Sequence, residues 1–108
     1  MGAVQTITPQ ELKRRLEVEK PPIVLDVREP WEYAVCRLPG ARHIPMREIP
    51  GRLNELSPDD EIVLVCHHGV RSLQVANFLA RQGFDRLYNL AGGVDAYARE
   101  VDPGMALY

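Results

Sequence analysis

The strongest chemical signal in the sequence is the seven-residue segment "CHHGVRS", Cys66 to Ser72. It follows the apolar run "IVLV" and precedes a helical pattern, so the thiol of Cys66 is expected where unpaired backbone N–H groups favour an anion. A cysteine at such a position favours the thiolate form. Gly69 permits the tight curl that turns successive N–H groups inward. The segment therefore predicts a nucleophilic cysteine with a cradle for negative charge.

The other side chains of the segment indicate an anionic substrate. Arg71 carries a permanent charge and a fork of donors that matches oxyanions. His67 and His68 can carry partial charge near neutrality. Adjacent histidines in an extended segment are expected to point apart, so we expect these two to shape the rim of the site and to hold no metal. We assign catalysis to Cys66, expect no cofactor, and assign substrate binding to the remaining residues of the segment: His67, His68, Gly69, Val70, Arg71 and Ser72.

A second polar group follows the apolar run "IVL" at positions 23–25. Asp26 is interpreted as a helix N-cap, as a supporting residue that orients the Cys66 segment or Arg71 by hydrogen bonds, or as both. Arg28 is interpreted as a second supporting residue or as a surface residue, and its spacing of four from Glu32 predicts an ion pair between them.

The elements that position these residues alternate along the chain. Apolar runs predict strands, and capping residues and apolar spacing predict helices. "TPQE", at positions 8–11, is a capping box that starts the first helix. Strands are predicted at 23–27, 41–45, 62–66 and 86–90, helices at 9–20, 29–35, 72–82 and 92–101, and a weak, broken helical pattern at 46–60. This order predicts an α/β fold with a mainly parallel central sheet of about five strands and helices on both faces. Ligands then collect at the carboxyl ends of the strands.

Composition limits the function classes. The chain has 108 residues, which favours one domain over residues 1–108, and its net charge of −2 gives no general attraction to nucleic acid or membrane. No apolar stretch approaches the roughly 20 residues of a membrane span, and "MGAVQTITPQ" lacks the pattern of a signal peptide. Cys36 and Cys66 are too few for a disulfide framework, so we expect a reducing cytoplasm. We also expect a monomer. Apolar neighbours favour a buried Cys36; a resolving thiol that bonds to Cys66 is the alternative.

Three stretches together resemble the rhodanese family of single-domain sulfurtransferases, and the resemblance covers nearly the whole chain. They are "LDVREPWEYAVCRLPGARHIPM", "IVLVCHHGVRSLQVANFLARQGF" and "LYNLAGGVDAYAREVDP". The resemblance implies a rhodanese-like fold and a Cys66 persulfide. The Cys66 thiolate would take the outer sulfur of a donor such as thiosulfate and pass it to cyanide, a thiol or a protein. Arg71 would attract the anionic end of the donor.

Two alternatives stay open within this resemblance. One is a sulfur-relay module that serves a protein partner in cofactor or thionucleoside synthesis. The other is a cysteine-dependent phosphatase or arsenate reductase on the same fold. Relatives of the latter kind have five residues between cysteine and arginine, whereas four separate Cys66 from Arg71 here. The shorter segment suits a sulfur atom and crowds a phosphate.

Overall fold

The computed structural model describes residues 4–108 and shows a five-stranded parallel sheet. The strands are β1 (Gln5–Ile7), β2 (Ile23–Asp26), β3 (Arg42–His43), β4 (Ile62–Val65) and β5 (Leu87–Leu90). Their order is β1-β5-β4-β2-β3, and every pairing is parallel. The predicted fold class is confirmed. The first three residues of the stretch searched for a signal peptide lie outside the described range.

Strand β1 was missed by the sequence analysis. It has three residues, of which Gln5 and Thr6 are exposed and Ile7 is buried. So short a segment shows no diagnostic alternation. It is a strand because β5 supplies a partner, with Gln5 opposite Tyr88 and Ile7 opposite Leu90.

The helices lie close to where the sequence predicts them. They are α1 (Pro9–Leu16), α2 (Pro30–Val35), α3 (Val70–Arg81) and α4 (Gly93–Glu100), with a 3-10 segment over Met46–Glu55. The capping box of α1 is formed, because Thr8 Oγ1 accepts from the Glu11 N–H and Glu11 Oε1 accepts from the Thr8 N–H. Helix α3 begins two residues before the predicted Ser72, because left-handed Gly69 turns the chain into the helix.

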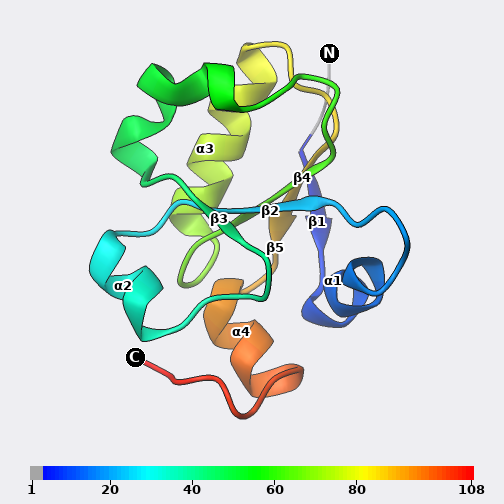
Figure 1. Cartoon of the computed structure of the whole chain (residues 1–108), viewed down its shortest axis with the longest axis vertical. Coiled ribbons are helices and arrows are strands. Elements are labelled where there is room, and N and C mark those ends of the chain that lie inside the picture. The colour runs from blue at the N-terminus through cyan, green and yellow to red at the C-terminus, as the bar shows by residue number, and fades with distance from the viewer. Residues whose placement is uncertain (1–3) are drawn as a thin grey trace.

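The sheet is buried on both faces, which explains its continuous apolar strands. Side chains on one face of the sheet, such as Leu25 and Leu64, pack with α3 and the 3-10 segment. Side chains on the opposite face, such as Val24 and Val63, pack with α1 and α4. In Figure 1, α3 and α4 lie on opposite sides of the strands. Within residues 4–108, no helix is long and apolar enough to cross a bilayer.

Candidate active site

The Cys66 sulfur lies in a cradle of donors at the carboxyl end of β4. Its side chain is buried, and Sγ accepts hydrogen bonds from the backbone N–H of Gly69 at 3.1 Å and of Ser72 at 3.4 Å. Gly69 has φ of +103°, the left-handed region that bends the segment around the sulfur. Ser72 stands in the first turn of α3, where N–H groups have no helical partner. The two donors therefore stabilise negative charge on this sulfur.

Asn89 completes the cradle, and the sequence analysis did not identify it. The Ser72 hydroxyl lies 3.3 Å from Cys66 Sγ and 2.5 Å from Asn89 Oδ1. Asn89 Nδ2 donates to the Gly69 carbonyl oxygen at 3.0 Å. Because the hydroxyl has a single proton, it donates either to the sulfur or to the amide oxygen. The Ser72 hydroxyl can therefore donate to Cys66 Sγ when the sulfur is charged and to Asn89 Oδ1 when it is not.

Helix α4 braces the segment from the other side. The Val94 N–H donates to the Cys66 carbonyl oxygen at 2.9 Å, and the Asp95 N–H donates to the His67 carbonyl oxygen at 3.1 Å. The approach is close enough that a Cβ on Gly93 would collide with both carbonyls. Gly93 also has φ of +62°. Glycine is therefore required at this position, because a Cβ would collide with the two carbonyls and because the backbone is in the left-handed region.

Arg71 is held by an acid that the sequence analysis assigned to another partner. Its Nη1 and Nη2 donate to Glu32 Oε1 and Oε2 at 2.6 and 2.8 Å. These bonds lower the pKa of Glu32 to about 2 against the effect of burial, with help from the Glu29 N–H and the Tyr108 hydroxyl. The predicted ion pair of Arg28 with Glu32 is wrong, since the bond from Arg28 Nη1 to Glu32 goes to the backbone carbonyl oxygen and not to the carboxylate.

The buried pair of Asp26 and Arg28 supports α2. Arg28 Nε and Nη2 donate to the Asp26 carboxylate at 2.7 to 3.0 Å, and its backbone N–H donates there as well. Both side chains are almost completely buried. Asp26 therefore orients Arg28 and not Arg71, which corrects one of its proposed roles. The N-cap of α2 is Glu29, which corrects the other.

The two histidines lie together, contrary to expectation. Their ring centroids are 3.9 Å apart, and the His67 ring also stacks on Tyr108 at 4.0 Å. With Asp95, they form a group whose candidate ligand atoms lie within 4.8 Å of one another. Burial and the neighbouring His68 lower the pKa of His67. The histidine rings therefore pack together at the rim and do not point apart.

The Val70 side chain is exposed, so within the cradle this position contributes backbone alone. Cys36 is a buried free thiol whose packing cluster lies on the α1 and α4 face, whereas Cys66 packs on the α3 face.

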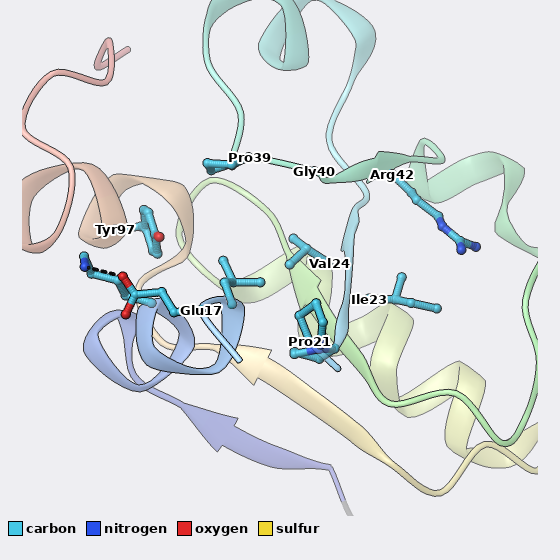
Figure 2. A pocket seen from close by; sticks show the side chains of 11 residues that line it. Glu17, Pro21, Ile23, Val24, Pro39, Gly40, Arg42 and Tyr97 are labelled. Atoms are coloured by element: carbon cyan, nitrogen blue, oxygen red, sulfur yellow. Dashed lines mark hydrogen bonds and ion pairs between the residues drawn. The ribbon is translucent and has the colours of Figure 1, made fainter. Parts of the chain in front are cut away.

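A separate groove of about 640 Å³ lies away from the cradle. Figure 2 shows it between α1 and the turn at Pro39 and Gly40, with Val24 and Tyr97 in its wall. None of its lining residues belongs to the segment from Cys66 to Ser72. The groove is therefore a separate surface feature from the Cys66 cradle.

Comparison with known proteins agrees with this geometry. Residues 8–100 match the family model described as a rhodanese-like domain. The chain belongs to the rhodanese-like family. A sulfurtransferase of Allochromatium vinosum is 37% identical over 103 residues, which cover 95% of this chain and 96% of that protein. The crystal structure of a rhodanese-like domain protein from Staphylococcus aureus superposes with a TM-score of 0.85 at 36% identity, covering 97% of this chain and 99% of that one.

Rhodanese-like domains also occur within longer relatives. A chloroplastic rhodanese-like/PpiC domain-containing protein of Arabidopsis thaliana is 40% identical over 89 residues, which cover 79% of this chain and 30% of the plant protein. The family match and the sulfurtransferase relative together support a sulfurtransferase.

Proposed function

We propose that this rhodanese-like protein transfers a sulfane sulfur through a persulfide on Cys66, with thiosulfate or a persulfide as donor. The observation that carries the proposal is the cradle of N–H donors around a buried sulfur in a family of sulfurtransferases. Such a cradle stabilises the thiolate before the reaction and the persulfide anion after it.

With thiosulfate, the reaction needs no further reagent. The Cys66 thiolate attacks the outer sulfur, a new S–S bond forms, and sulfite leaves with the electron pair of the broken bond. The product carries the same single negative charge on the enzyme, so the same donors serve both states. In the second step a cyanide ion or a thiolate attacks the outer sulfur, and the Cys66 thiolate leaves.

The second candidate is relay of the sulfur to a protein partner. Val70 and Leu73 are exposed apolar residues at the start of α3, and Trp31 is an exposed aromatic residue beside Glu32. Because Glu32 and Arg71 are bonded, these side chains flank the cradle. The exposure of Trp31 favours an acceptor that covers the site.

Thiosulfate-to-cyanide turnover by the purified protein and by Cys66→Ser tests both candidates. We expect a mass gain of about 32 Da on Cys66 in the native protein and none in the variant. Rapid turnover indicates an enzyme that works alone, and stoichiometric loading with negligible turnover indicates relay. Absence of loading from both thiosulfate and a small persulfide, together with hydrolysis of an aryl phosphate, would refute sulfur transfer.

The proposal includes the organisation of the molecule. We propose that residues 1–108 form one monomeric domain, act in the cytoplasm on a small anionic donor, and need neither nucleic acid nor membrane. The low net charge of −2 supports the last point. Light scattering of the purified protein tests the monomer, and a concentration-dependent doubling of the mass would refute it.

A further inference from the structure

The segment after α4 returns to the candidate active site and ends there in Tyr108. Figure 1 shows this segment, in red, turning back beneath α4 and ending beside α2. The Tyr108 ring stacks on His67 with centroids 4.0 Å apart and meets the edge of Trp31 at 5.5 Å. One side chain thus contacts both the Cys66 segment and the helix that carries Glu32.

The Tyr108 hydroxyl is engaged on both sides. It donates to Glu32 Oε2 at 2.9 Å and accepts from Arg28 Nη1 at 2.8 Å. Arg28 is fully buried and fixed by Asp26. The hydroxyl therefore joins a rigid buried cation to the carboxylate that holds Arg71.

With Tyr108 in place, the Glu32 carboxylate has no free position. Oε1 accepts from Arg71 Nη1 and from the Glu29 N–H, while Oε2 accepts from Arg71 Nη2 and from Tyr108. Four donors match the roughly four lone-pair sites of a carboxylate. A carboxylate held at all four sites cannot rotate without breaking a bond, so it sets the plane of the guanidinium paired with it.

We propose that Tyr108 is a positioning residue of the sulfur-transfer site, which orients Arg71 toward anionic reagents by fixing Glu32. The inference rests on the proposed function for its biological meaning, but the geometry that it describes is independent of the sulfur donor. A role in packing alone predicts a loss of stability without any change in the preference of Cys66 for charged reagents.

Two alkylating reagents of nearly equal size separate these roles. Iodoacetate is an anion and iodoacetamide is neutral; with each, the Cys66 thiolate forms a C–S bond and iodide leaves. The ratio of their second-order rate constants measures the influence of Arg71 on an incoming anion. Tyr108→Phe keeps the ring and removes the hydroxyl. We expect it to lower the ratio about three- to tenfold, the effect of one hydrogen bond.

Further variants supply a control and test whether Tyr108 acts through Glu32. Tyr88, on β5, has a comparable hydroxyl that donates to Glu61 at 3.1 Å. Tyr88→Phe removes this hydroxyl and should leave the ratio of rate constants unchanged. The double variant Tyr108→Phe/Glu32→Gln should be no lower than Glu32→Gln alone, because Tyr108 acts through Glu32.

A second measurement does not depend on Cys66. Carboxyl NMR of Tyr108→Phe should show that the pKa of Glu32 rises from its native value of about 2. The inference is overturned by an unchanged Glu32 titration, by equal slowing of both reagents, or by multiplicative effects in the double variant. If the alkylation ratio responds as expected while neither sulfur donor loads Cys66, sulfur transfer is refuted and the positioning role stands.

Discussion

Glu32→Gln tests how much the buried carboxylate beside the cradle contributes to the free energy of unfolding. The pKa of Glu32 falls from 4.5 to about 2 on folding, which corresponds to roughly 3 kcal/mol of stability at neutral pH. The side chain is 5% exposed, so solvent screens its ion pair little. Because the pKa is lowered in the folded state, this stability is complete above about pH 5 and is lost as the pH falls toward 2. The glutamine variant should therefore lose roughly 3 kcal/mol at about pH 7 and about 2 kcal/mol at about pH 3.5.

Urea unfolding of both proteins across this pH range measures the difference. Glu55→Gln is the matched control, since Glu55 accepts two bonds from Arg52 at 2.7 and 2.9 Å in an exposed pair. The control should change stability little at any pH, because exposed ion pairs contribute weakly. A loss below about 1 kcal/mol at neutral pH in Glu32→Gln, or a loss that does not vary with pH, would refute the reasoning.

Four further predictions concern other contacts of the site. Gly93→Ala should destabilise the protein by more than about 2 kcal/mol in urea unfolding, because its Cβ collides with backbone; a neutral effect would show that α4 can shift freely. Asn89→Ala should cost about 1–3 kcal/mol and slow persulfide loading about tenfold in stopped flow, since the buried Ser72 hydroxyl and the partly buried Gly69 carbonyl oxygen each lose a bond. Arg28→Met should cost about 3–5 kcal/mol in the same unfolding assay, because it leaves a buried carboxylate unpaired; equal stability would contradict the buried pair. Mild peroxide followed by peptide mapping should give no disulfide between Cys36 and Cys66, and its formation would establish a resolving thiol.

The sequence identified what depends on local structure. Cys66, Gly69 and Ser72 lie within one strand-to-helix turn, so their relative positions can be predicted from their spacing along the chain. The buried strands β2 and β4 were predicted for a similar reason, since a continuous apolar run of this length reports burial on both faces.

The remaining parts of the site depend on contacts between distant segments. Glu32 is 39 residues from Arg71, Asn89 is 17 residues from Ser72, and Tyr108 is 76 residues from Glu32. Nothing in the local pattern around Glu32 distinguishes a partner four residues away from one on another helix. One local signal was available for Gly93, because "AGG" directly follows a predicted strand and paired glycines mark a close approach of backbone.

The strand order protects the element that carries the reactive sulfur. β4 lies at the centre of the sheet between β5 and β2, and the two outer strands, β1 and β3, have only three and two residues. Edges this short give another chain little to pair with, which limits aggregation through the sheet. Central strands also open least often, so the amides of β4 should exchange with deuterium more slowly than those of either edge. The cysteine thus follows the strand that we expect to exchange most slowly, and fraying of an edge strand should leave its cradle intact.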